Sequence, residues 1–237
     1  MSFLSVRNIS HRFEHKEIFT NASLDITKGT ITGLLGPNGS GKTTFFDILC
    51  GLIHPQGGIV TNTAVRQLYL SQTLSTPASL RMSDVFRLLA ALACTSPPSI
   101  LDVTAKLKQW PPQIGKRYLE ISKKKPATCS YGEVRCFFTL SLLLMPSDLI
   151  ILDEPTAGVD PEFRYYIWLC LRQAAAQGTT VVVSSHYIEE LANNCDVFHS
   201  ISNAKFITFN CAEDYLKQYN ANSLDEAFIK SLADSTE

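Results

Sequence analysis

Three short segments of the chain are rich in apolar and β-branched residues and end in polar residues. They are residues 31–35 (ITGLL), 149–152 (LIIL) and 180–183 (TVVV). A strand with one solvated face alternates apolar and polar positions, whereas a strand covered on both faces is apolar at nearly every position. These segments therefore predict buried strands of a parallel sheet.

Helical segments with recognisable ends accompany these strands. One runs from Thr43 to Gly51, and a second begins after Asp160, whose side chain can cap a helix, and ends at Gly178. In the second, apolar residues recur at helical spacing. Because a strand, a helix and a strand in this order form a right-handed crossover between parallel strands, the sequence predicts an α/β fold with a mostly parallel sheet.

Composition and charge limit the partners and the cellular location that the chain can have. The chain has 237 residues, and its 21 basic and 22 acidic residues offer no electrostatic basis for a nucleic-acid partner. Seven scattered cysteines lack metal-ligand spacing and suit a reducing interior. We expect no signal peptide at the N-terminus. The longest apolar run, residues 137–145, is too short to span a bilayer, so a membrane role would depend on a partner.

The residues after the first strand match the phosphate-binding loop pattern: glycine, four free positions, glycine, lysine and a hydroxyl residue. They are Gly36, Pro37, Asn38, Gly39, Ser40, Gly41, Lys42, Thr43 and Thr44. In this pattern backbone N–H groups and a helix N-terminus cradle phosphates, Lys42 reaches the β- and γ-phosphates, and the Thr43 hydroxyl ligates Mg2+. The alternative is a glycine-rich turn with a solvated lysine. Strand, loop and helix follow in the required order, so we predict a nucleotide site.

Polar residues also end the other two strands. Asp153 and Glu154 follow the second strand, and His186 follows the third. Functional residues collect at the carboxyl ends of parallel strands. We predict that Asp153 holds Mg2+, that Glu154 polarises the attacking water, and that His186 senses the γ-phosphate. The alternatives are a strand end with solvated acids and a packed or solvated histidine.

Together these motifs resemble those of the ABC (ATP-binding cassette) ATPases, in the same order, over residues 3–209. The resemblance implies a P-loop NTPase core with a mostly parallel sheet, a small antiparallel β-subdomain and an inserted α-helical subdomain. It implies that Phe13 stacks on adenine, that Gln72 contacts Mg2+ and the attacking water, and that Asp160 lies in a loop crossing to a second subunit. Taken alone, Phe13 would be a packing residue and Gln72 an exposed amide.

The signature of this family, Leu-Ser-Gly-Gly-Gln, is altered in this chain. The corresponding residues are Cys129, Ser130, Tyr131, Gly132 and Glu133. Ser130 and Glu133 have the spacing of a capping box, which predicts a helix start. The resemblance implies that Ser130, Gly132 and Glu133 face the γ-phosphate of a second subunit's ATP. Tyr131 replaces a glycine and puts in question how closely that phosphate can approach.

The domain organisation follows from the same resemblance. We expect a nucleotide-binding domain over residues 1–212, with the helical subdomain inserted at about 74–145, and a short helical tail over residues 213–237. Residues 83–92 predict an amphipathic helix within the insertion. The short interval between Gly51 and Gln72 predicts a reduced antiparallel β-subdomain.

Two polar segments lie within the predicted helical subdomain. Residues 95–99 (TSPPS) predict a loop. Residues 123–125 are three lysines, which we interpret as a solvated run, with contact to a partner or to lipid headgroups as the alternative.

The resemblance implies an ATPase subunit of a membrane transporter that binds ATP and Mg2+. Its expected partners are integral membrane permease subunits and a second ATPase subunit, either a homodimer mate or a similar chain. We expect it in the cytoplasm, peripheral on the cytoplasmic face of the membrane. Residues 184–191 and 221–229 resemble the bacterial drug and polysaccharide exporter branch. The alternatives are a soluble ABC-type ATPase acting on ribosomes or DNA, and a nucleotide-binding regulator that does not hydrolyse.

Overall fold

A six-stranded sheet organises the chain in the computed structural model, which describes residues 3–93 and 96–233. Its strand order is β5-β6-β7-β3-β8-β9, and all neighbours are parallel except β8 and β9. The strands are β3 (Ile31–Leu35), β5 (Gln67–Leu70), β6 (Leu149–Asp153), β7 (Thr180–Ser185), β8 (Val197–Ser202) and β9 (Lys205–Phe209). The three strands predicted from apolar runs are neighbours at the centre of this sheet.

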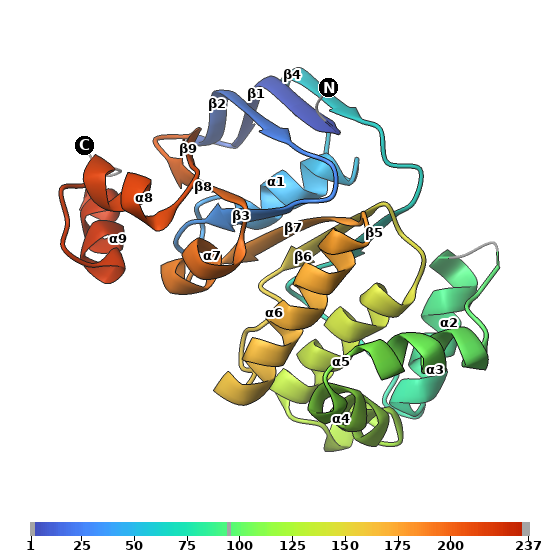
Figure 1. The fold of residues 1–237 in the computed structure, drawn as a ribbon. Helices are drawn as coiled ribbons and strands as arrows, with labels where there is room; N and C mark the ends of the chain where they lie inside the picture. The colour runs from blue at the N-terminus through green and yellow to red at the C-terminus, as the bar shows by residue number, and fades with distance from the viewer. Residues whose placement is uncertain (1–2, 94–95, 234–237) are drawn as a thin grey trace.

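Both faces of the sheet are covered, because alternate strand residues enter two different cores. Ile151 and Val182 belong to a core that also contains β1 (Leu4–Phe13), β2 (Lys16–Ile26) and helix α1 (Lys42–Leu49). Ile150 and Val183 belong to the larger core on the opposite face, with helices α5 (Tyr131–Leu144), α6 (Pro161–Ala176) and α7 (Ile188–Asn194). Figure 1 shows α1 between the two sheets and α6 and α7 on the other side of the central sheet.

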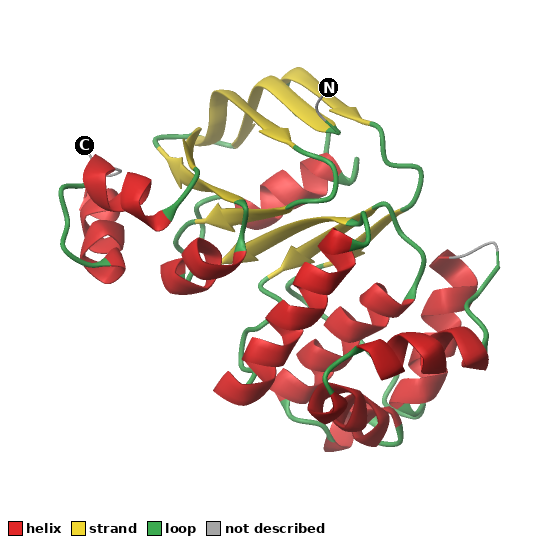
Figure 2. Cartoon of the chain, viewed as in Figure 1, coloured by secondary structure: helices red, strands yellow, loops and turns green. Residues whose placement is uncertain are grey.

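A second, antiparallel sheet lies at one end of the molecule. It has the order β2-β1-β4, with strands β1 (Leu4–Phe13), β2 (Lys16–Ile26) and β4 (Gly57–Asn62). Of these three strands, only β4 comes from the short interval between Gly51 and Gln72 (Figure 2).

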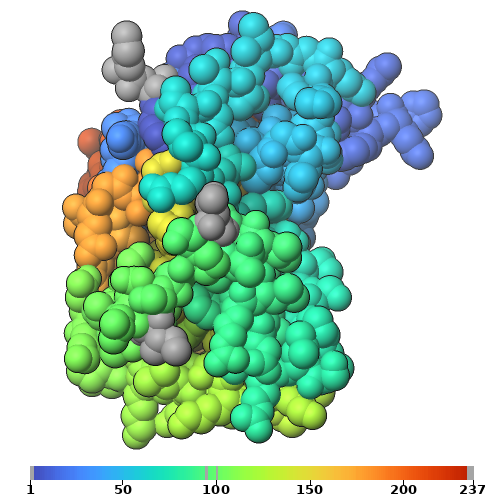
Figure 3. Space-filling model, turned by 90° about the vertical axis from the view of Figure 1, so that its right-hand side faces the viewer, coloured from blue at the N-terminus to red at the C-terminus, as the bar shows by residue number. Residues whose placement is uncertain are grey.

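Four helices between β5 and β6 form the opposite end of the molecule. They are α2 (Met82–Ala93), α3 (Ile100–Gln109), α4 (Pro112–Ser122) and α5 (Tyr131–Leu144), with a 3-10 turn, η1 (Pro126–Thr128), before α5. The space-filling view shows this green helical end separate from the blue N-terminal strands (Figure 3). The predicted helix over residues 83–92 corresponds to α2.

The remaining helices complete the cover of the sheet. Asp160 caps α6 as predicted. The elements are α6 (Pro161–Ala176), α7 (Ile188–Asn194), α8 (Ala212–Gln218) and α9 (Leu224–Ala233). The last two lie beside β8 and β9, away from α2–α4 (Figure 1). No helix within the described residues is sufficiently long and apolar to cross a membrane.

Several sequence predictions extend beyond the described residues. The predicted loop over residues 95–99 begins at Thr95, and the expected ranges 1–212 and 213–237 include residues 1–2, 94–95 and 234–237. These positions lie outside the described residues.

Candidate functional site

The loop between β3 and α1 closes around its own lysine. Lys42 Nζ donates to the carbonyl oxygens of Gly36 (2.8 Å) and Pro37 (3.2 Å), so the start of the helix is tied to the end of the strand. Gly41 has a φ of 107°, and a Cβ there would lie 2.5 Å from Ile18 Cγ2. Only glycine fits this turn, which leaves the first N–H groups of α1 at the carboxyl edge of the sheet.

Two hydroxyl groups hold the Asp153 carboxylate at the end of β6. Thr43 Oγ1 donates to Asp153 Oδ2 (2.6 Å), and Ser184 Oγ donates to Asp153 Oδ1 (2.5 Å). Ser184 Oγ also accepts from the Glu154 N–H (3.0 Å). These contacts join α1, β6 and β7 at one point. The oxygens of Thr43 and Asp153 are of the type that Mg2+ prefers.

The Glu154 carboxylate is buried between two basic side chains. Lys42 Nζ lies 3.5 Å from Glu154 Oε1, and His186 Nδ1 lies 3.3 Å from Glu154 Oε2. A buried carboxylate is unfavourable without charged or hydrogen-bonding partners, and Lys42 places a positive charge beside this one. Glu154 also has a φ of 53°, and such backbone strain in a residue other than glycine clusters at functional sites.

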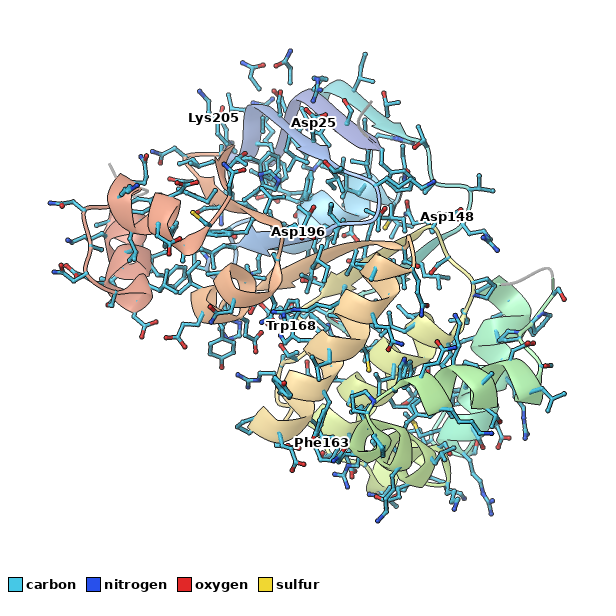
Figure 4. The ribbon with its side chains drawn as sticks, in the orientation of Figure 1. Asp25, Asp148, Phe163, Trp168, Asp196 and Lys205 are labelled. Carbon is cyan, nitrogen blue, oxygen red and sulfur yellow. The ribbon has the colours of Figure 1, made fainter. Side chains whose placement is uncertain are left out.

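A cavity of about 260 Å3 lies between Glu154 and the phosphate-binding loop. It lies at the carboxyl edge of the sheet, whereas Asp148 and Asp196, labelled in Figure 4, precede β6 and β8 at the opposite edge. Gln72, two residues after β5, lines it. The lining residues are Ile18, Asn38, Gly39, Gly41, Lys42, Thr43, Thr44, Gln72 and Glu154.

A fully buried arginine ties two segments of this cavity together. Arg135, on α5, donates from Nε to the Glu154 carbonyl (2.9 Å) and from Nη1 to the carbonyls of Ser71 (2.8 Å) and Gln72 (3.0 Å). Burial lowers the pKa of its guanidinium. The backbone positions of Glu154 and Gln72 therefore both depend on α5.

The signature residues begin α5 beside a separate cavity. Ser130 and Glu133 form the predicted capping box: Ser130 Oγ accepts from the Glu133 N–H, and the Glu133 side chain accepts from the Ser130 N–H. A Cβ on Gly132 would lie 2.1 Å from the Gly158 carbonyl oxygen, so only glycine permits this contact. The exposed Tyr131 ring lies against Gly158, where a Cβ would meet Tyr131 Cδ1 at 2.8 Å.

A buried glutamate connects the loop before α6 to the end of β7. Glu190, on α7, accepts from Thr156 Oγ1 (2.8 Å) and Ser185 Oγ (3.3 Å), and it pairs with Arg164 Nε (3.1 Å). Asp160 lies between Thr156 and Arg164 in sequence and accepts from the α6 backbone at 3.1 Å. The segment carrying Asp160 is thus fixed to the strand that precedes His186.

The family assignment rests on a match to a family model. Residues 19–157, more than half of the chain, match the model described as ABC transporter. The chain belongs to the ABC transporter family. ATPase activity is general for this family, so the predicted family, fold class and ATP-binding ATPase assignment are confirmed. A second model, described as an AAA domain of a putative AbiEii toxin, matches only residues 125–192.

Curated relatives of this ABC chain include transport proteins. Protein McbF of Escherichia coli is 29% identical over 231 residues, which cover 95% of this chain and 92% of McbF. The Nod factor export ATP-binding protein I of Burkholderia orbicola is 30% identical over 199 residues. That match covers 81% of this chain but only 66% of the relative, so the chain spans about two thirds of that protein's length.

Solved ABC structures share the fold. A structure of the ATP-binding subunit of an ABC transporter superposes with a TM-score of 0.80 at 20% identity, covering 98% of this chain and all of the other. The dimeric structure of MJ0796, a bacterial ABC transporter cassette, has a TM-score of 0.72 at 19% identity and covers 87% of this chain and 98% of the other.

The structure brings most of the predicted site residues into two groups. Lys42, Thr43, Gln72, Asp153, Glu154 and His186 gather with the phosphate-binding loop. Ser130, Gly132, Glu133 and Asp160 line another cavity of about 200 Å3, which shares no lining residue with the first. Phe13 lies half-exposed at the end of β1 and lines neither cavity, so its adenine contact stays a prediction.

The central lysine of the run over residues 123–125 is partly exposed and also makes an ion pair, which the interpretation as a solvated run did not include. Lys124 Nζ lies 2.7 Å from Glu133 Oε1. Sequence reasoning also missed Arg135, Ser184 and Glu190, whose partners are distant in the sequence. Of these three residues, only Arg135 could have been found from the sequence, because a charged residue inside the apolar run 134–138 needs a buried partner.

Proposed function

We propose that this chain is the ATP-hydrolysing subunit of an ABC exporter, and that Mg-ATP binding closes two such subunits on each other. The observation that carries the proposal is the Glu154 carboxylate, which is held between Lys42 and His186 at the cavity of the phosphate-binding loop. From there Glu154 accepts a proton from the attacking water, Lys42 binds the phosphates, and His186 contacts the γ-phosphate and orients Glu154.

The residues present fit a magnesium ion. Thr43 and Asp153 place two oxygen atoms 2.6 Å from each other, and Gln72 lines the cavity that Thr43 also lines. Bound there, Mg2+ would neutralise charge that develops on the phosphates during transfer. Ser184 holds the second Asp153 oxygen, so the carboxylate is oriented before any ligand arrives.

The second subunit supplies the other half of the ATP site in this proposal. Ser130, Gly132 and Glu133 line a cavity apart from the phosphate-binding loop, and Asp160 lines the same cavity. This separation supports the proposal that they meet the ATP of a partner, which is either a second copy or a similar chain. We assign residues 1–212 to the nucleotide-binding domain, with a helical subdomain at about 74–145, and residues 213–237 to the tail.

Transport itself requires partners with membrane-spanning segments. We infer integral membrane permease subunits, with this chain peripheral on the cytoplasmic face. The similarity to a Nod factor export ATP-binding protein favours export. We assign the adenine contact to Phe13, which ends β1 with a half-exposed ring.

Affinity purification of the tagged full-length chain from solubilised native membranes tests this function. We expect a multi-span membrane protein to co-purify and the complex to hydrolyse ATP. Glu154→Gln should remove the hydrolysis, while Asp225→Asn, a matched change at an exposed carboxylate on α9, should not. Recovery with ribosomes or DNA, and without any integral membrane protein, would contradict the proposal.

A further inference from the structure

Glu133 ends the signature with an acid where the family sequence has a neutral glutamine. It is the third residue of α5, at the helix end that, under the proposed function, receives the γ-phosphate of the partner's ATP. An unpaired carboxylate there would repel the phosphate, because like charges a few ångströms apart oppose each other strongly at a partly buried site.

Two basic side chains meet the Glu133 carboxylate. Lys124 Nζ lies 2.7 Å from Glu133 Oε1, and Arg117 Nη2 lies 2.9 Å from the same oxygen. The other oxygen accepts from the Ser130 N–H at 3.1 Å. Burial acts to raise the pKa of Glu133, but the Lys124 and Ser130 hydrogen bonds and the two positive charges outweigh it and lower the pKa. The carboxylate is therefore ionised and paired twice.

The two cations come from different segments and are held in place. Arg117 belongs to α4, and its guanidinium carbon lies 5.2 Å from the ring centroid of Phe163, which Figure 4 labels near the start of α6. Lys124 follows α4, and its backbone carbonyl accepts from the Met82 N–H (2.9 Å). Only 11% of the Glu133 side chain is exposed, against 37% for Lys124 and 32% for Arg117. The cations thus present the more accessible charge.

We propose that Lys124 and Arg117 are positioning residues that neutralise Glu133, so that the signature end of α5 can accept the γ-phosphate of a second subunit's ATP. This inference rests on the proposed function. It explains how a signature ending in an acid works: two cations offset the charge of Glu133 beside the helix N-terminus. Arg117 also lies near a second carboxylate, Glu120, but that contact is longer, at 3.9 Å, and more exposed.

ATP-driven dimerisation of the full-length Glu154→Gln protein measures this role. In that background, Lys124→Ala with Arg117→Ala should raise the ATP concentration for half-maximal dimerisation about tenfold at low salt. The difference should shrink at high salt, since screening weakens exposed charges. ADP binding by the monomer, which does not use the signature residues of a second subunit, checks that the variant is folded.

Restoring the family's glutamine separates charge neutralisation from a purely structural brace. When Glu133→Gln is added to the double variant, dimerisation should return to within about twofold of the Glu154→Gln parent, because no unpaired carboxylate remains. Glutamine also suits the third position of a capping box, so the helix start is kept. Lys123→Ala with Lys125→Ala removes two exposed neighbouring charges and serves as the matched control.

The outcomes distinguish this inference from the function on which it rests. A parent that dimerises with ATP, combined with an unchanged double variant, would overturn the neutralising role alone. Failure of Glu133→Gln to restore dimerisation would also overturn the neutralising role. Lys124 and Arg117 would then have a purely structural role. A parent that stays monomeric with saturating Mg-ATP would overturn the proposed function and this inference with it.

Discussion

Lys42 Nζ lies 3.5 Å from Glu154 Oε1, and only 6% of the lysine and 8% of the glutamate side chain are exposed. The lysine also donates to two loop carbonyls. One buried cation therefore links the phosphate-binding loop to the proposed catalytic carboxylate. Loss of either partner leaves the other charge buried and without its closest opposite charge, which is more costly than loss of an exposed pair.

Lys42→Ala tests whether this lysine contributes to nucleotide binding. We expect ATP affinity, measured by calorimetry on the purified chain, to fall by about tenfold or more, because a charge-assisted contact to phosphate is lost. Lys28→Ala removes an exposed lysine before β3 and should leave the affinity unchanged. Equal ATP affinities for Lys42→Ala and the unmodified chain would remove Lys42 from the site.

Arg135→Met tests whether α5 holds the backbone of the site. Three carbonyl groups lose their donor, and unsatisfied buried polar groups cost about 1–3 kcal/mol each. We expect the free energy of unfolding in urea to fall by about 3 kcal/mol or more. Arg87→Met, at a side chain that is 73% exposed, is the control. Similar stabilities for the two variants would show that the Arg135 contacts contribute little.

Gly132→Ala tests the close packing of the signature helix on the loop before α6. The added Cβ would lie 2.1 Å from the Gly158 carbonyl oxygen, so α5 or that loop must move. Overpacking of this kind costs about 1–3 kcal/mol of unfolding free energy. Gly57→Ala, whose Cβ would meet Ser10 Cβ at an ordinary 3.7 Å, should change stability by less than about 0.5 kcal/mol. Equal effects would refute the packing argument.

His199 gives the stability a defined pH dependence. Burial lowers its pKa from 6.5 to about 4, with a small opposing effect from Asp25. Between those values the unfolded chain binds a proton that the folded chain does not, so the free energy of unfolding decreases as pH falls from about 6.5 to about 4. The contribution is about 3 kcal/mol at neutral pH and is lost through that window.

Urea unfolding at pH 4.5 and pH 7 measures this dependence. His199→Gln should be less sensitive to pH than the unmodified chain, whereas His54→Gln, at an exposed histidine, should not differ from it. Parallel pH profiles for His199→Gln and the unmodified chain would contradict the assignment to His199.

The sequence predicts those parts of the site that are local in the chain. Lys42 and Thr43 are fixed by loop spacing, and Asp153, Glu154 and His186 follow directly after apolar strands. A parallel sheet brings such positions to one edge whatever lies between them. The central strands and the caps of α5 and α6 were predictable for the same reason.

Contacts between distant segments were not predictable in this way. Arg135 meets Ser71 across 64 positions, and Glu190 meets Thr156 across 34. Neither pairing follows from local pattern, because it depends on how α5 and α7 pack on the sheet. The Lys124 contact was also not predictable. A run of three lysines predicts solvated side chains, and the ion pair of Lys124 with Glu133 depends on the fold.

The rate of ATP hydrolysis by Glu154→Gln tests the central claim most directly. Phosphate release at saturating Mg-ATP should fall by about 100-fold or more, because general-base catalysis contributes about that much. ATP binding should persist, since Lys42 and the loop remain. Phosphate release within about twofold of the unmodified chain would contradict the assignment of Glu154 as the base that activates the attacking water.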